Sequence, residues 1–425
     1  MNFSSSFFTA FFPAFLRPYL VVFAAATFFL FSFINLNSFN ALNELLRSFY
    51  QVDAVKISNL SAMYFYGNII FMIPAGLLLD RISIRKLLIS VMLISILSSF
   101  VFTWSSHLYL AMFSRFIIGL CSTFCLLSTA KLTSRWFPAH HCALIMGLVV
   151  TMAMLGGAIA QQLPALVNLT HSWQWAMSFI SILGIFFWLC ILLFVQDYPP
   201  NYQEVKKPKD QGFFKTLFQA IFNLQTWIAG IYSNLLTLPI IILGALWGKA
   251  YLTTVHHESI SQAGVSISFI FLGTLLGCPL AGFISDKLKR RKMPMLIGSF
   301  LTLLMALILL TERILSPLET STLFFLMGLF SGSQVITFAL VIESNPKHMT
   351  ALSESVAAMI IMSAGAIFQP LFAYLLEFNW DGKTENHLAI YSPADFHTAF
   401  LLLPIAFGLS VLLTFFIKET YCRSR

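Results

Sequence analysis

Twelve long apolar runs limit the fold of this 425-residue chain more than any other feature. A helix needs about 20 mainly apolar residues to cross the hydrocarbon core of a bilayer. Such runs predict spans at 19–41, 58–79, 86–104, 108–133, 142–166, 173–195, 222–252, 261–283, 293–311, 319–342, 351–377 and 396–418. Because the runs are unbroken rather than alternating, they argue against a membrane β-barrel. The sequence therefore predicts an all-α membrane protein with twelve transmembrane helices.

Composition and charge support a membrane protein and predict its orientation. Hydrophobic residues make up 58% of the chain and charged residues 10%, whereas about 25% of a typical soluble domain is charged. If both termini are cytoplasmic, 19 of the 25 basic residues lie in inner segments and four lie in outer segments. Basic residues collect on the cytoplasmic side of membrane proteins. We therefore expect a multi-pass protein of the cell inner (plasma) membrane, with both termini cytoplasmic, the lipid bilayer as partner and no nucleic acid.

The widest polar stretch between spans follows the sixth span. It covers 196–221, contains Pro199, Pro200 and Pro208, and predicts a cytoplasmic linker between six-helix bundles at 19–195 and 222–418. Residues 1–18 are rich in phenylalanine and carry only Arg17 as a basic residue, so an interfacial segment is expected there. Residues 419–425 are expected to form a cytoplasmic tail.

An internal repeat relates the two predicted bundles. A loop pattern after the second span recurs after the eighth span, with every matching position offset by 206 residues. Topology alone explains basic residues in an inner loop, but it does not explain glycine and aspartate at a fixed offset, so the pattern indicates duplication. The matching residues are Gly76, Asp80, Arg81, Arg85 and Lys86 in the first copy, and Gly282, Asp286, Lys287, Arg291 and Lys292 in the second.

These loops resemble the conserved loop between helices two and three of the major facilitator superfamily, and the resemblance covers essentially the whole chain. It implies two pseudo-symmetric six-helix bundles that rock about a midplane site in alternating access, and a monomer is expected. It also implies gating roles for the ten loop residues. Gly76 and Gly282 would allow helices to approach closely, and the aspartates would pair with arginines in one state only.

A second resemblance lies within the fourth span. Arg115-Phe-Ile-Ile-Gly119 is similar to the superfamily's Arg-x-x-x-Gly element. An arginine inside a membrane costs about 2.5–3.5 kcal/mol on insertion scales, so something should compensate it. Two interpretations stay open: a structural arginine satisfied by carbonyls or a neighbouring helix, or a cavity arginine that senses an anionic group or takes part in coupling. Lys249, near the outer end of the seventh span, is expected to snorkel to the interface.

Finer resemblances suggest a direction of transport and a solute. Phe368-Gln369-Pro370-Leu371 and Tyr391-Ser392-Pro393-Ala394-Asp395 resemble phagosomal-transporter (Pht) type importers of intracellular bacteria. The lysosomal dipeptide carriers are a looser match. This resemblance implies import of amino acids or nucleosides. The Gly-Pro pair that drug–proton antiporters carry in helix five is missing from 147–164, which makes drug efflux less expected.

Polar residues on apolar helices mark a candidate midplane site. Asn37, Asn40 and Glu44 are spaced by three and four residues, so they share a helix face. Amides and hydroxyls suit neutral or zwitterionic ligands, because each can donate and accept. For each residue alone, an interhelical hydrogen bond is the better explanation, but it explains the clusters of the first and seventh spans together less well. The further candidates are Tyr64, Asn68, Arg115, Gln161, Tyr232, Asn234, Gln334 and Gln369.

Together these patterns predict a secondary active or facilitative transporter of a small polar organic solute (an amino acid, short peptide or nucleoside). No Walker loop or H-E-x-x-H motif occurs, so we expect neither ATP-driven transport nor an enzyme, and no cofactor or metal site. The energy coupling stays open, because the acidic residues Glu44, Glu343 and Glu377 lie at helix ends. A coupled proton could bind to Glu44 or to an acidic substrate. Uniport is equally permitted. The alternative is a proton-coupled exporter of amphipathic compounds or drugs.

Overall fold

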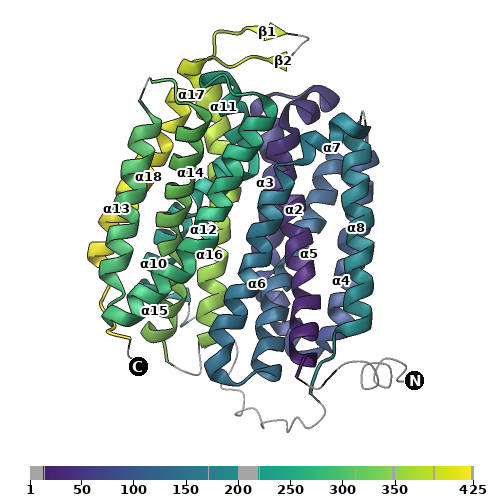
Figure 1. Ribbon diagram of the computed structural model, residues 1–425, viewed down its shortest axis with the longest axis vertical. Coiled ribbons are helices and arrows are strands. Elements are labelled where there is room, and N and C mark those ends of the chain that lie inside the picture. The colour runs from purple at the N-terminus through teal and green to yellow at the C-terminus, as the bar shows by residue number, and fades with distance from the viewer. Residues whose placement is uncertain are drawn as a thin grey trace.

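A computed structural model describes residues 13, 15–170, 172–199, 219, 221–311, 313–346, 350–385 and 388–422. It is nearly all helical (Figure 1). The first half of the chain forms α2 (Arg17–Tyr50), α3 (Ala54–Arg81), α4 (Ile84–Trp104), α5 (Leu108–Trp136), α6 (Ala139–Ala160), α7 (Leu163–Thr170) and α8 (Trp173–Phe194).

The second half forms α10 (Leu224–Leu236), a π-helix η1 (Pro239–Trp247), α11 (Gly248–Val255), α12 (Ile260–Leu288), α13 (Lys292–Leu309), α14 (Pro317–Ser331), a 3₁₀ turn η2 (Gly332–Val335), α15 (Ile336–Ser344), α16 (Thr350–Phe378), α17 (Pro393–Phe400) and α18 (Leu402–Phe416). A short antiparallel hairpin, β1 (Thr384–Glu385) and β2 (Leu388–Ala389), precedes α17.

The predicted transmembrane fold is confirmed. Within the described ranges, eleven helices are long and apolar enough to cross a membrane, and α6 with α7 make a twelfth span if this bent pair is counted as one. Large apolar side chains lie exposed on the outside of the bundle, such as Phe113, Leu276 and Phe415, where lipid would cover them. Most of the expected linker and the ends of the chain (1–12, 14, 200–218, 220 and 423–425) lie outside the described residues.

Prolines break two of the spans. The bend of 44° between α6 and α7 lies beside Pro164, and the π-helix of the seventh span begins at Pro239. Proline lacks the N–H that would continue an α-helical ladder, and π-turns and kinks arise where that ladder is interrupted. The seventh span therefore keeps its length but changes its hydrogen-bond pattern in the middle of the bundle.

The two halves repeat the same helix packing. A Cβ added at Gly67 of α3 would lie 2.1 Å from the carbonyl oxygen of Phe116 in α5. A Cβ at Gly273 of α12, the position 206 residues later, would lie 2.1 Å from the carbonyl oxygen of Phe325 in α14. Small residues allow such close backbone contact in membrane helices. The fixed offset found in the loops thus extends into the packing of the spans.

The largest contacts between the halves are three helix pairs: α3 packs against α16, α6 against α12, and α2 against η1. We call the end of the bundle where α2 begins and α18 ends the terminal end, and the end that carries β1 and β2 the distal end (Figure 1). Direct hydrogen bonds join the halves from the middle toward the distal end. Tyr66 donates to the carbonyl of Ala366 (3.1 Å), and Asn43 donates to the carbonyl of Leu246 (2.8 Å).

Two phenylalanines fill glycine sites across this contact. Phe65 of α3 lies against Gly365 of α16, and Phe271 of α12 lies against Gly157 of α6, where an added Cβ would come within 2.3 Å and 2.4 Å of the respective rings. Phe65 and Phe271 are both fully buried and are again 206 residues apart. The contact between the halves is therefore pseudo-symmetric, with an aromatic side chain from each half seated on a glycine of the other.

Candidate functional site

Arg115 lies buried among α2, α3 and α5. Its side chain is 1% exposed, and its Nη1 donates to the carbonyl oxygen of Asn35 (2.9 Å). The guanidinium stands over the ring of Phe39, 4.1 Å from the centroid. Its Nε and Nη2 atoms have no hydrogen-bond partner among the described residues. One carbonyl and two aromatic rings, those of Phe39 and Tyr64, therefore compensate the charge only in part.

One other predicted residue, Tyr64, lies beside this arginine, and a second, Asn68, lies on the same helix as Tyr64. The ring of Tyr64 lies 5.4 Å from the guanidinium, and its hydroxyl pairs with Ser32 (2.7 Å). Asn68, one turn along α3, donates to the hydroxyl of Ser122 (2.8 Å), while its Oδ1 is buried without a donor in the described structure. Arg115 and this segment of α3 thus present unused donors and an unused acceptor in the same half of the protein.

Asn40 and Gln161 form the polar centre of the contact between the halves. Asn40 donates to Oε1 of Gln161 (2.8 Å), and Gln161 donates to the carbonyl of Gly244 in η1 (2.9 Å). The Oδ1 of Asn40 accepts the backbone N–H of Lys249 (2.9 Å). We call this set of residues, together with Asn43 and Leu246, the distal seam. It links α2 and the end of α6 to the seventh span.

The expectation that Lys249 snorkels to the interface is wrong. Its side chain is 7% exposed, and its Nζ donates to the carbonyl oxygen of Ala41 in the other half (2.8 Å). Snorkelling requires a free path to water along the helix surface, but α2 packs over this face. A buried ammonium group therefore crosses the distal seam.

The π-helix offers carbonyls to amide side chains from neighbouring helices. Gln369 of α16 donates to the carbonyl of Ile241 (3.0 Å), as Asn43 does to that of Leu246. The remaining oxygens, Oε1 of Gln369 and Oδ1 of Asn43, are buried without a donor in the described part of the chain, as is Oδ1 of Asn37. Each of these amides therefore keeps an acceptor without a donor among the described residues.

Three predicted residues instead make contacts within the second half. Tyr232 donates to the carbonyl of Met295 (2.7 Å), and Asn234 donates to that of Ile360 (2.6 Å). The side-chain oxygen of Gln334 accepts the hydroxyl of Thr237. These contacts hold neighbouring helices together. Glu44, expected to share a face with Asn37 and Asn40, is exposed at the distal end of α2, whereas the two asparagines are fully buried.

In the first loop copy, a carboxylate from the segment after the sixth span caps α4. Asp197 accepts the hydroxyl of Ser83 (2.5 Å) and the backbone N–H of Arg85 (3.0 Å), and the Arg85 side chain donates to the carbonyl of Leu192 (2.8 Å). Lys86 places its backbone N–H on the Ser83 hydroxyl (3.3 Å). Arg81 is exposed, and the side chain of Asp80 lies outside the described residues.

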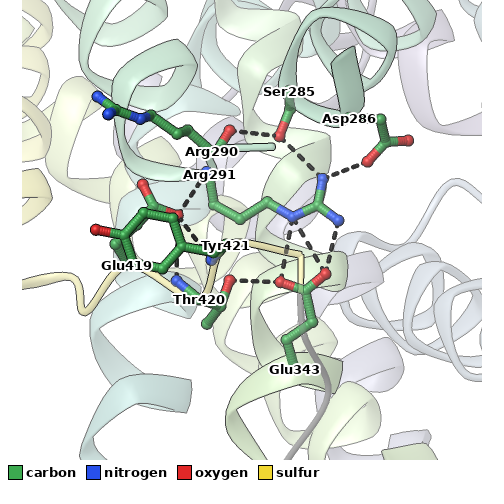
Figure 2. Close-up of polar contacts among 8 residues, drawn as sticks. All are labelled: Ser285, Asp286, Arg290, Arg291, Glu343, Glu419, Thr420 and Tyr421. Carbon is green, nitrogen blue, oxygen red and sulfur yellow. Dashed lines mark hydrogen bonds and ion pairs between the residues drawn. The ribbon is translucent and has the colours of Figure 1, made fainter. Parts of the chain in front are cut away.

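The second loop copy forms an ion-pair network around Arg291 (Figure 2). Its Nη1 lies 2.6 Å from Asp286, and its Nη2 lies 2.6 Å from Glu343. Burial alone would lower the pKa of Arg291, but the bonds to Glu343 and Asp286 raise that pKa above its ordinary value. Figure 2 also shows Glu419 accepting the Arg291 backbone N–H (2.8 Å). The predicted pairing of Asp286 with an arginine is present at the terminal end.

Glu419 caps α13 as Asp197 caps α4. It accepts the backbone N–H groups of Arg291 and of Lys292 (3.0 Å). Burial would raise the pKa of Glu419, but these donated N–H groups lower it below its ordinary value. Lys292 donates its ammonium to the carbonyl of Phe415 (3.0 Å), and Lys287 lies 6.0 Å from the ring centre of Phe283. The sequence did not predict that Glu343 and Glu419 contact Arg291, although both are acidic residues at the ends of apolar runs.

The expected close approach at the loop glycines is wrong for this state. A Cβ added at Gly76 or at Gly282 would meet nothing within 4 Å. Both glycines lie toward the terminal end, whereas Gly157 and Gly365 on the distal side are covered by aromatic rings. The halves are therefore closed together distally, and the loop glycines have open space beside them.

In the part of the chain that the structure describes, no group of three or more His, Cys, Asp or Glu side chains could hold a metal ion. The gathered groups are amides, hydroxyls and two buried cations. Together, these groups can donate and accept hydrogen bonds.

Comparisons with known proteins agree with this architecture. The chain is 23% identical over 368 residues to the "Probable galactarate/D-glucarate transporter GudP" of Escherichia coli, covering 76% of this chain and 79% of that protein. It is 26% identical over 156 residues to a "Quinolone resistance transporter" of Acinetobacter baumannii, covering 34% of each chain.

The fold is similar to that of a bacterial homolog of the human lysosomal transporter Spinster, solved in an inward-facing, unoccupied conformation. The TM-score is 0.72 at 14% identity, over 94% of this chain and 95% of that one. The sequence pattern of the Major Facilitator Superfamily matches residues 21–370 and again 244–421. On the fold, the repeated loops and this match, the chain belongs to the Major Facilitator Superfamily.

Proposed function

We propose that this protein is a secondary active or facilitative carrier that imports a small polar organic solute by alternating access. Amino acids, short peptides and nucleosides are the solutes that its amides and hydroxyls suit, in line with the resemblance to Pht-type importers. The membrane is the cell inner membrane, and the terminal end faces the cytoplasm because basic residues collect there. With the distal seam closed, the described state is then inward-open.

The environment of Arg115 is the strongest support for this proposal. Its guanidinium is buried, no carboxylate of a described residue pairs with it, and two of its donor atoms are unused. A charged group deep in a membrane protein pairs with an opposite charge or with backbone carbonyls, and a guanidinium binds a carboxylate with paired hydrogen bonds. An amino acid or peptide carboxylate would complete this site, whereas a nucleoside would not.

A sugar acid is a second candidate solute. The Escherichia coli relative is named for galactarate and D-glucarate, which are hydroxylated carboxylates. Hydroxyl groups could bond to the unused oxygens of Asn68 and Gln369 while a carboxylate binds Arg115. Export of an amphipathic compound, the activity for which the Acinetobacter relative is named, remains the alternative, and the missing Gly-Pro element in the fifth span speaks against it.

Uptake by the purified protein in liposomes tests this proposal. The panel holds a labelled amino acid, a dipeptide, a nucleoside and a sugar acid, each with and without an imposed pH gradient. We expect uptake or exchange of at least one carboxylate-bearing solute, and Arg115→Ala should lower it by about ten-fold or more, because charge-assisted hydrogen bonds are lost.

Arg313→Ala is the matched control, since Arg313 is 71% exposed at the distal end and pairs only with Glu319 among the described residues; it should transport at the normal rate. If no solute of the panel moves in either direction, the importer assignment is wrong. If Arg115→Ala transports at the normal rate, the carboxylate-binding role of Arg115 is wrong.

A further inference from the structure

The distal end holds a second contact between the halves, built on Glu377. This residue ends α16 in the second half and lies beside the start of α3 in the first half. Its Oε1 accepts the backbone N–H of Ala54 (3.0 Å) and the hydroxyl of Tyr391 (3.1 Å). Ala54 N also lies 3.2 Å from the Tyr391 hydroxyl. We call Ala54, Glu377 and Tyr391 the distal latch.

The distal latch supplies the hydrogen-bond acceptors for the backbone N–H of Ala54, at the N-terminus of α3. Asp53 caps α3, but its side chain accepts the N–H of Lys56 (2.7 Å). The N–H of Ala54 is therefore satisfied from the other half among the described residues. Helix N-termini carry partial positive charge and favour an anion, so an ionised Glu377 is the better partner there. This contact exists only while the distal ends of the halves are together.

The hairpin that precedes α17 holds Tyr391 in place. Arg47 of α2 donates to the carbonyl of Ala389 (2.9 Å) and lies over the Tyr391 ring, 5.0 Å from its centre. Trp380 donates to the carbonyl of Ile390 (2.9 Å). Burial raises the pKa of Tyr391, so the hydroxyl stays protonated and donates to the carboxylate.

Glu377 is half-buried, so water at the distal side reaches it in this state. The charged groups around it are Arg47 on α2, Asp53 and Lys56 at the start of α3, Tyr391 after β2, and Asp395 at the start of α17. The Asp395 carboxylate accepts the backbone N–H of Ser392 (2.7 Å), and Lys56 forms an ion pair with Asp53 (3.3 Å). Glu377 has no ion-pair partner in the described ranges, so protonation removes its charge without breaking a salt bridge.

We propose that Glu377 is a proton-binding site on the distal face, and that proton binding there unlocks the distal seam. Ionised, the carboxylate accepts one charge-assisted hydrogen bond across the halves, from the N–H of Ala54, and one within its own half, from the Tyr391 hydroxyl. Protonated, it accepts neutral hydrogen bonds, which are about half as strong. A ligand that favours one state shifts the population by its differential affinity. A proton from the distal compartment therefore favours opening toward that compartment, where the solute is captured. The direction of coupling rests on the proposed function, whereas the pH response does not.

The test measures the distance between spin labels on the full chain in liposomes without solute. Labels at Ser48→Cys and Leu318→Cys lie on exposed distal positions of the two halves, in a variant whose native cysteines are replaced by serine. Between about pH 7.5 and about pH 3.5, which lie on either side of the pKa of a free glutamic acid side chain, the ratio of long to short distances should rise about ten-fold. Glu377→Gln should show the high ratio at both pH values.

Two matched variants separate this role from general damage. Glu319→Gln changes another distal carboxylate, one that caps α14 within a single half, and should keep the normal pH response. Tyr391→Phe removes one latch contact but leaves the carboxylate, so it should raise the ratio at neutral pH and still respond to acid. The proposal is overturned if the unmodified latch shows no pH response, or if Glu377→Gln retains it. Loss of transport alone would bear on the proposed function and not on this result.

Discussion

Replacing one glycine should hold the distal end open. In Gly365→Ala, the new Cβ would lie 2.3 Å from ring carbons of Phe65, whereas ordinary contact begins at 3.4 Å. The ring or the helices must therefore separate by about 1 Å. Phe65 is 0% exposed, so its ring has no open space into which to turn. The clash exists only while α3 and α16 are together.

The size of the effect follows from the cost of overpacking. Extra methyl groups in a packed core cost about 1–3 kcal/mol, and here the cost falls on the distally closed state alone. That corresponds to a shift of about 5–150-fold toward the open state. Gly157→Ala, which faces Phe271 at 2.4 Å in the contact between α6 and α12, should shift the population in the same direction.

The same pair of distal spin labels measures the shift. Gly147→Ala is the control, because a Cβ there meets nothing within 4 Å and the gain in helix propensity from glycine to alanine is the same. Adding Phe65→Leu to Gly365→Ala should restore closure by making room. The reasoning is refuted if Gly365→Ala and Gly147→Ala give the same distance distribution.

Two further predictions concern stability. Glu343→Ala leaves Arg291 buried with only the 69%-exposed Asp286 as ion-pair partner and should cost at least about 2 kcal/mol of unfolding free energy. Arg313→Ala, which breaks the exposed pair with Glu319, should cost less than about 1 kcal/mol. Equal losses in thermal unfolding in detergent would contradict the network's role. Burial and the nearby His257 lower the pKa of His256, whose Nδ1 accepts the N–H of Leu315 (3.1 Å). As pH falls, the unfolded chain therefore protonates this histidine before the folded chain does. The free energy of unfolding should fall as pH drops below about 6.5, by at most about 1.4 kcal/mol per pH unit. His256→Gln should flatten that part of a profile of melting temperature against pH, and an unchanged slope would exclude His256 as the cause of the pH dependence.

The sequence alone was enough to place the spans and the repeat. Hydrophobicity over about 20 residues is a local property, so the span predicted at 86–104 is found as α4 (Ile84–Trp104) and that at 351–377 as α16 (Thr350–Phe378). The offset of 206 residues relates Arg85 to Arg291 in the loops. The same offset relates Phe65 to Phe271, a correspondence visible in the printed sequence that the search for loop motifs overlooked.

Only the tertiary structure decided which side chains meet across the halves. Periodicity put Lys249 on a span but not on the face that α2 covers, and it could not show that Glu377 caps a helix in the other half. The spacing of Gly76 and Gly282 predicts small residues at a contact, yet in this state the contact lies at Gly157 and Gly365. Local sequence determines where each helix starts and which faces are apolar. Contacts between two bodies that move depend on their relative position, because the same helix faces separate in one state and pack together in the other.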